Sequence, residues 1–278
     1  MRKIFGLLLF LGLTACTDKP SEQAQTGQPP AATTVVADSL PTTPPATHYA
    51  PQTVALADIP AKLRLPGQLL EGWRWTDANG ENLLVVFRVV SLSKQQQAVP
   101  SPDSSQVEDM QDFERTARLA ARQYVRPQGQ RDYQELWRLQ DAVADCSLDL
   151  TLRLQPGSTA ITDLDQNGRS ETTLVYALAC RGDISGADLK LIMRAGATKY
   201  ALRGSSLVQY DSIPAEQRQP RNPCCLDRLS ATQREQGNTE GYYQTEAEFQ
   251  AAPPAFLAFA RQHWQKFSVE KLGEHEDL

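Results

Sequence analysis

The chain has few of the residues that most often carry catalysis or bind metals through nitrogen. It contains only three histidines, His48, His263 and His275. A Ser-His-Asp or Cys-His catalytic set would depend on His263 alone, and a histidine-ligated zinc site has no support. No Cys-x-x-Cys motif, no phosphate-binding glycine loop and no Rossmann fingerprint is present. We therefore lean towards a protein that is not an enzyme, although carboxylate-based hydrolysis of glycosides stays open, because the separation of Asp and Glu side chains is invisible in sequence.

Clusters of positive charge and long apolar runs are missing as well. The 28 Lys and Arg residues are outnumbered by 33 Asp and Glu residues, and the basic residues form no run after the first few positions. Binding to nucleic acid requires a basic face that neutralises phosphates, so we expect no nucleic-acid partner. The strongest internal apolar stretch, residues 83–90, is interrupted by Arg88. It is too short to cross a bilayer, which takes about 20 residues.

The amino terminus has the pattern of a bacterial lipoprotein leader. Arg2 and Lys3 precede the apolar run 4–13, and Thr14-Ala15 lead to Cys16. We expect residues 1–15 to be a signal peptide that is removed, and Cys16 to be acylated, with palmitate among its chains. More than one acyl chain gives stable membrane anchoring. An ordinary secretory leader followed by a coincidental cysteine is the alternative.

Residues 16–53 are rich in Pro, Thr, Ala, Ser and Gln and have almost no large apolar side chains. Such a segment cannot bury enough apolar surface to offset its ordering entropy, so we expect a disordered tether. Its mean reach would be on the order of 35 Å. Thr17, rather than Asp, follows the lipidated cysteine. In bacterial lipoproteins, a residue other than Asp at this position favours sorting to the outer membrane. We therefore expect an outer-membrane location, with the folded part facing the periplasm or the cell surface.

We expect residues 54–278 to form a single β-rich domain of the α+β class. Asn79-Gly80 lies between two β-prone runs and predicts a β-hairpin. A polar loop is expected over 93–112. The sequence favours further strands over 115–125, where a helix is the alternative, and over 133–140, 146–154, 172–180, 188–193 and 199–202.

The last expected element is an amphipathic helix that begins at Pro253-Pro254. Its apolar side chains share one face and are typical of packing against a core: Phe256, Leu257, Phe259, Ala260, Trp264 and Phe267. The predicted architecture is an antiparallel sheet built of hairpins with a packed C-terminal helix.

The segment 163–171 has the spacing of a calcium-binding loop. Oxygen-bearing side chains stand at its positions 1, 3, 5 and 9, a glycine at position 6, and a residue that offers its backbone carbonyl at position 7. A complete EF-hand needs Glu at position 12, where Leu174 stands. The spacing instead resembles the nine-residue calcium loop found between strands of integrin-type propeller repeats, which usually ends in Asp. The alternative is a polar hairpin whose carboxylates face water. The predicted ligands are Asp163, Asp165, Asn167, Arg169 and Glu171.

Four cysteines follow Cys16, and an envelope location would be oxidising. Cys146 and Cys180 lie nearly equidistant from the acidic loop, so a hairpin around that loop would bring them together as a disulfide. Cys224 and Cys225 are adjacent. They are expected to be structural, either as a vicinal disulfide or in separate links.

One block of the chain, roughly 134–204, resembles a family of bacterial envelope proteins labelled surface polysaccharide biosynthesis protein. The motifs that carry the resemblance include Leu136-Trp137-Arg138-Leu139-Gln140-Asp141, Asp145-Cys146-Ser147-Leu148-Asp149, Cys180-Arg181-Gly182-Asp183-Ile184-Ser185 and Lys199-Tyr200-Ala201-Leu202-Arg203-Gly204. The resemblance implies a role connected with surface polysaccharide and no particular catalytic residue. Several polar residues of the block either line a shared surface or belong to strand ends and turns: Asp141, Asp149, Asp183, Lys190, Lys199 and Arg203.

The sequence thus predicts a lipid-anchored envelope protein with a calcium-stabilised β domain that binds a glycan or a protein partner. A carboxylate-based enzyme that acts on cell-surface polysaccharide, and an assembly factor without a ligand, are the alternatives.

Overall fold

The computed structural model describes residues 49–92, 114–209, 214, 224–236 and 239–271. The expected signal peptide, Cys16, most of the expected tether and the expected loop 93–112 lie outside these residues.

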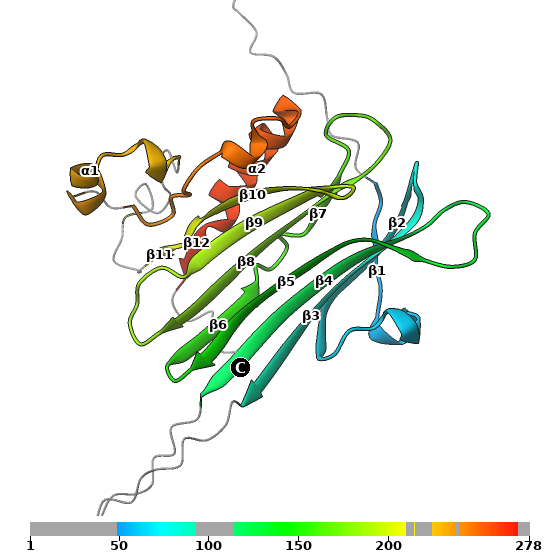
Figure 1. Ribbon diagram of the computed structural model, residues 1–278, viewed down its shortest axis with the longest axis horizontal. Coiled ribbons are helices and arrows are strands. Elements are labelled where there is room, and N and C mark those ends of the chain that lie inside the picture. The colour runs from blue at the N-terminus through cyan, green and yellow to red at the C-terminus, as the bar shows by residue number, and fades with distance from the viewer. Residues whose placement is uncertain (1–48, 93–113, 210–213, 215–223, 237–238, 272–278) are drawn as a thin grey trace, which may run out of the picture. The chain divides into compact units, whose positions relative to one another are not determined.

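Five antiparallel strands form the first sheet in the order in which they occur in the chain (Figure 1). They are β1 (Gln52–Thr53), β2 (Gln68–Asp77), β3 (Gly80–Leu92), β4 (Arg115–Arg126) and β5 (Gln134–Cys146). The predicted Asn-Gly hairpin is confirmed, because Asp77 pairs with Gly80 across the turn. Gly80 has a φ of 120°, and a Cβ there would lie 2.3 Å from the Arg126 carbonyl oxygen, so this position requires glycine. The segment left open between helix and strand is a strand, β4.

The second sheet has the order β10-β9-β8-β6, and β7 also pairs with β8. Its strands are β6 (Asp149–Leu154), β7 (Ala160–Thr162), β8 (Glu171–Arg181), β9 (Asp188–Ala195) and β10 (Thr198–Ser205). The strands expected over 172–180, 188–193 and 199–202 are therefore present. The strand expected over 146–154 begins only at Asp149, because Cys146 ends β5 and the chain turns between them.

The remaining elements are short, except for one helix. They are η1 (Leu56–Asp58), η2 (Ala61–Leu63), η4 (Leu226–Arg228), α1 (Ala231–Gln236), η5 (Ala247–Phe249), α2 (Pro254–Phe267) and a parallel strand pair, β11 (Leu207–Gln209) with β12 (Val269–Lys271). The predicted C-terminal helix is α2, which buries Phe256, Ala260 and Trp264. No described helix is long and apolar enough to cross a membrane. The β-rich α+β class with a packed C-terminal helix is thus confirmed.

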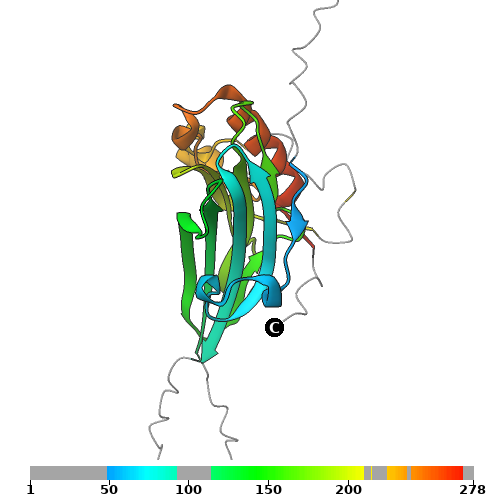
Figure 2. The same cartoon turned by 90° about the vertical axis from the view of Figure 1, so that its right-hand side faces the viewer.

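Each sheet has buried apolar side chains on both of its faces. The inner faces meet in a core that includes Leu84, Leu152 and Leu174. The outer face of the second sheet packs against α2 through a separate apolar cluster, as Figures 1 and 2 show. This two-sided burial explains the run 83–87 on β3, in which successive side chains point to opposite faces and every one is apolar and buried.

The segment before β2 covers the outer face of the first sheet. Val54, Ile59, Leu63 and Leu65 pack against a cluster that contains Phe87. β1 pairs with β2, with Thr53 opposite Trp73. The last residues of the expected tether, at least from Tyr49, therefore belong to the folded domain rather than to a disordered segment.

The disulfide between Cys146 and Cys180 joins the two sheets. Its Cα atoms lie 5.6 Å apart. The expectation of a link within one hairpin is wrong, because Cys146 ends β5 of the first sheet, while Cys180 lies on β8 of the second and is paired with Leu150. The bond therefore ties the layers together at one end of the core.

Candidate metal centre

The acidic loop connects β7 to β8, and strand pairing brings its two ends together. Thr162, the last residue of β7, lies opposite Glu171, the first residue of β8. Asp163 follows Thr162 directly, so its side chain starts beside Glu171. Asp163 and Glu171 are buried, whereas Asp165 is exposed at the tip of the loop. One carboxylate oxygen from each of these three residues lies within 4.8 Å of the other two.

Hydrogen bonds within the loop hold this arrangement. Asp163 Oδ1 accepts from the Asn167 backbone N–H at 2.9 Å, and Asp163 Oδ2 accepts from the Gly168 N–H at 3.0 Å. Gln166 and Gly168 have φ values of 58° and 79°, which lets the chain turn back on itself within a few residues. The carboxylate of Asp163 therefore organises the turn around itself.

Glu171 is the electrostatically unusual member of the group. Its Oε2 accepts from the Thr162 hydroxyl at 3.1 Å and from the Leu164 N–H at 2.8 Å. Burial, together with the carboxylates of Asp165 and Asp163, raises the pKa of Glu171 to about 7, although the two hydrogen bonds oppose the rise. A cation placed among the three carboxylates would offset both the desolvation and the repulsion.

The loop is also anchored to the first sheet. Asp77 Oδ2 accepts from the Ser170 N–H at 2.9 Å and from its hydroxyl at 2.6 Å, and the Trp75 indole donates to the same hydroxyl at 2.8 Å. Tyr49 donates to Asp163 Oδ2 at 3.1 Å. Burial and this hydrogen bond raise the pKa of Tyr49. Asp77 and Tyr49 were missed by sequence reasoning, because they lie 93 and 114 residues from their partners and belong to no local motif.

Three of the five predicted ligands, Asp163, Asp165 and Glu171, bring carboxylate oxygens together. The Asn167 amide donates to Asp165 Oδ2 at 2.9 Å, and its oxygen accepts from the Arg169 N–H at 2.7 Å, so the side chain braces the loop. The converging donor set of Asp163, Asp165 and Glu171 is composed of carboxylate oxygens, which suits a hard cation such as Ca²⁺. Asp163 and Glu171 would hold the ion from the buried side and Asp165 from the solvent side.

A second group of possible ligand atoms is unsuitable for a metal. The Sγ atoms of Cys224 and Cys225 and a carboxylate oxygen of Glu246 lie within 4.8 Å of one another, but the cysteines form a vicinal disulfide. Glu246 is already saturated. Its Oε1 accepts from Tyr243 and Arg261, both at 2.7 Å, and its Oε2 accepts from Arg261 at 2.8 Å. The Arg261 hydrogen bonds hold the pKa of Glu246 below its usual range.

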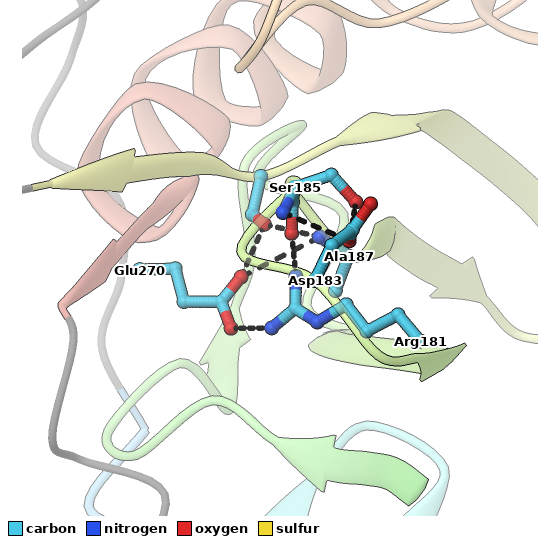
Figure 3. Close-up of polar contacts among 6 residues, drawn as sticks. Arg181, Asp183, Ser185, Ala187 and Glu270 are labelled. Atoms are coloured by element: carbon cyan, nitrogen blue, oxygen red, sulfur yellow. Dashed lines mark hydrogen bonds and ion pairs between the residues drawn. The ribbon is translucent and has the colours of Figure 1, made fainter. Parts of the chain in front are cut away.

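A third polar cluster fastens the carboxyl-terminal strand β12. Buried Glu270 pairs with Arg181, at the end of β8, and accepts from the Ser206 hydroxyl at 2.6 Å. The Ser206 oxygen in turn accepts from the Ala187 N–H at 2.8 Å. Figure 3 shows Arg181 reaching Glu270 beside the turn formed by Asp183 and Ser185. The contacts of Glu270, Arg181, Ser206 and Ala187 join separate segments of the chain, so their role is structural, and we call these four residues the lock.

One cavity of about 530 Å³ lies at the far end of β3, away from the acidic loop. The described residues that line it are Gly67, Gln68, Arg88, Val89, Val90 and Arg115. Among these described residues, two carry a guanidinium group and none carries a carboxylate.

Comparison of the chain with protein-family models, with curated proteins and with solved structures finds no match. The resemblance to the surface polysaccharide biosynthesis family therefore stays a prediction.

Proposed function

We propose that this protein is a lipid-anchored envelope protein whose β domain is stabilised by Ca²⁺ and has a non-enzymatic binding or assembly role connected with surface polysaccharide. The observation that carries the calcium part is the convergence of the Asp163, Asp165 and Glu171 carboxylates. The anchor and its outer-membrane location rest on the leader and on Cys16. The polysaccharide connection rests on the resemblance of residues 134–204.

Calcium is the ion that this loop favours. Flexible oxygen ligands from a short loop match the loose coordination of Ca²⁺, whereas Mg²⁺ demands stricter octahedral geometry and gives up its water reluctantly. The ion would bind only the folded domain, because the carboxylates are brought together by the pairing of β7 with β8. A ligand that binds only the folded state raises its stability by mass action.

Thermal unfolding with and without Ca²⁺ tests the calcium site. We expect the melting temperature to rise with the logarithm of Ca²⁺ concentration in the millimolar range and below, with a smaller rise for Mg²⁺. Asp165→Asn should weaken the rise and leave the metal-free melting temperature nearly unchanged, because Asp165 is exposed. Asp183→Asn is the matched control, since Asp183 forms a similar turn with Ser185 but has no such cluster. No shift at millimolar Ca²⁺ would reject the site.

The anchor and the polysaccharide role have separate tests. Cys16→Ser should abolish acylation, measured by labelling with a fatty-acid analogue, and should release the protein from membrane fractions.

Deletion of the gene should change the profile of surface glycans. Restoration of the wild-type chain should reverse the change, whereas restoration of the Cys16→Ser variant should not. An unchanged glycan profile would contradict the polysaccharide role without touching the calcium site.

A further inference from the structure

Among the described residues, the first sheet ends at β5, and part of the second sheet extends beyond this edge. β5 is its last strand, and no described strand pairs with β5 on the side away from β4. Across the core, β5 lies over β6 and β8, and β9 and β10 extend the second sheet beyond β8, as Figure 1 shows. Neighbouring strands lie about 4.8 Å apart. One more strand added to β5 would therefore lie over the inner face of β9 and β10.

This face of β9 and β10 carries four cations in two directly opposed pairs. Lys190 is in register with Arg203, and Arg194 with Lys199. The pair between them, Ile192 and Ala201, belongs to the core between the sheets, so all four cations point to the side of the first sheet. Like charges directly opposite each other destabilise a sheet. Two such pairs in one hairpin need compensation.

The compensation within the described residues is incomplete. Asp141 pairs with Lys190 at 2.5 Å, and Glu248 serves both Arg203 and Lys199. Two carboxylates thus face four cations. Arg194 donates to two backbone carbonyls, those of Ala197 at 3.2 Å and Arg138 at 3.0 Å. The side chains of Lys199 and Arg203 are 41% and 40% exposed.

The backbone of β5 is oriented to accept a partner along this edge. The Arg138 carbonyl points away from β4, since Arg194 of the other sheet donates to it. Backbone groups of alternate residues in a strand point to the same side. Gln140 and Ala142 therefore direct their N–H and C=O groups to the open edge, and both residues are exposed. The Ala142 N–H donates to Asp141 Oδ1 at 3.0 Å, so the groups that a partner strand would pair with directly are those of Gln140 and the Ala142 carbonyl.

We propose that this edge and the cationic face beside it bind an extended acidic segment of a protein partner, which adds to β5 as the next strand of the first sheet. Main-chain hydrogen bonds to β5 would provide affinity, and every second side chain of the segment would point a carboxylate towards the cations. A polysaccharide lacks the peptide backbone that an open strand edge pairs with, so the edge favours a peptide. The inference does not depend on the calcium site, on the anchor or on the polysaccharide role.

Binding of a probe peptide to the full-length chain tests the proposal. The probe is a labelled peptide of about nine residues in which Glu alternates with Val or Thr, long enough to cover one strand, and fluorescence anisotropy reports its binding. We expect saturable binding that weakens as salt screens the charges. A peptide with Lys in place of Glu, and one with alternate backbone nitrogens methylated, should both fail to bind.

Two variants separate the charges from the edge. The double variant Lys199→Glu/Arg203→Glu should weaken binding at least about tenfold. Gln140→Pro removes one outward N–H and leaves the pairing with β4 intact, because proline is tolerated where the N–H faces away from the sheet, and it should weaken binding similarly. Lys62→Glu, an exposed charge reversal on η2, is the control and should leave binding unchanged.

Each of the other outcomes overturns the proposal. Equal binding of the methylated peptide would show that β5 does not pair with the segment. Binding of alginate that matches or exceeds that of the peptide, with the same sensitivity to charge reversal, would identify a polyanion site. Self-association that the peptide disrupts and that Gln140→Pro abolishes would identify a second copy of the chain as the occupant.

Discussion

At the scale of single residues, buried polar side chains connect the two sheets. Gln123 on β4 is nearly inaccessible to solvent. Its amide donates to Asn82 at 2.8 Å, and its oxygen accepts from the Trp137 indole at 2.7 Å and from the Thr172 hydroxyl at 3.2 Å. One side chain thus satisfies groups on β3, β5 and β8.

Removal of this amide should be costly. Gln123→Met fills a similar volume but leaves the buried polar groups of its three partners without a hydrogen bond. Each unsatisfied buried group costs about 1–3 kcal/mol. We expect a loss of at least about 3 kcal/mol in the free energy of unfolding, measured by urea denaturation. Gln140→Met, on the exposed edge of β5, is the matched control and should change stability by less than about 0.5 kcal/mol. Equal effects of the two changes would contradict this role.

His263 on α2 makes stability depend on pH. Its ring stacks on Phe259 with centroids 4.9 Å apart, and its Nε2 lies 2.6 Å from the Ser158 carbonyl oxygen, which requires an N–H at that nitrogen. Burial lowers the pKa of His263, and Lys266 lowers it further, although the hydrogen bond to Ser158 opposes the shift. As the pH falls through about 6.5, His263 therefore takes up a proton in the unfolded chain more readily than in the folded chain.

The sign of the effect follows from this difference. The contribution of His263 is fully present above about pH 6.5 and is lost as the pH falls below that value, because protonation then favours the unfolded state. Urea denaturation of the wild type and of His263→Gln at neutral and mildly acidic pH measures the effect. The wild type should lose more stability on acidification than the variant does. Parallel losses would assign the pH dependence to other groups.

At the scale of elements, the lock around Glu270 decides whether β12 stays in place. Glu270→Gln keeps the shape of the side chain but removes the charge that faces Arg181, a guanidinium whose side chain is only 14% exposed. Breaking a buried ion pair from one side costs about 3–5 kcal/mol. Ser206→Ala removes one hydrogen bond from the same carboxylate and should cost about 1–2 kcal/mol.

Hydrogen exchange of the β11 and β12 amides tests the lock locally. Both variants should speed exchange in this strand pair before they affect β3 or β4, since the lock joins β12 to the end of β8. Uniform acceleration across the whole domain would instead show that the cluster supports global stability. Arg181→Met in the Glu270→Gln background should recover part of the loss, because it removes the unpaired charge.

Elements could be predicted from the sequence wherever one pattern repeated locally. The Asn79-Gly80 turn, the alternation in β6 and the aromatic face of α2 each identified their element. The division into two sheets could not be predicted, because it depends on which strands pair. Cys146 shows this best: it has the spacing of a hairpin partner for Cys180 but lies in the other sheet. Of the candidate site, the acidic spacing was visible, whereas Tyr49 and Asp77 come from distant segments.

At the scale of the whole molecule, both sheets depend on cover from outside the strands. α2 covers the second sheet, and the segment before β2 covers the first. The covering side chains Val54, Ile59, Leu63 and Leu65 are all buried. Full burial of one such side chain contributes about 1.5–3 kcal/mol, so four contribute about 6–12 kcal/mol as an upper bound. This amount is comparable with the whole stability of a typical domain, about 5–15 kcal/mol.

The position at which the chain is shortened should therefore decide whether the domain folds. A chain that starts at Tyr49 keeps the covering segment, β1 and the hydrogen bond from Tyr49 to Asp163. It should melt cooperatively near the temperature of the full-length protein. A chain that starts at Gly67 exposes Leu83, Val85 and Phe87 of β3 and should aggregate or bind a hydrophobic dye. Circular dichroism melting and size-exclusion chromatography distinguish the two, and a soluble, cooperatively melting Gly67 chain would show that the first sheet is stable without its cover.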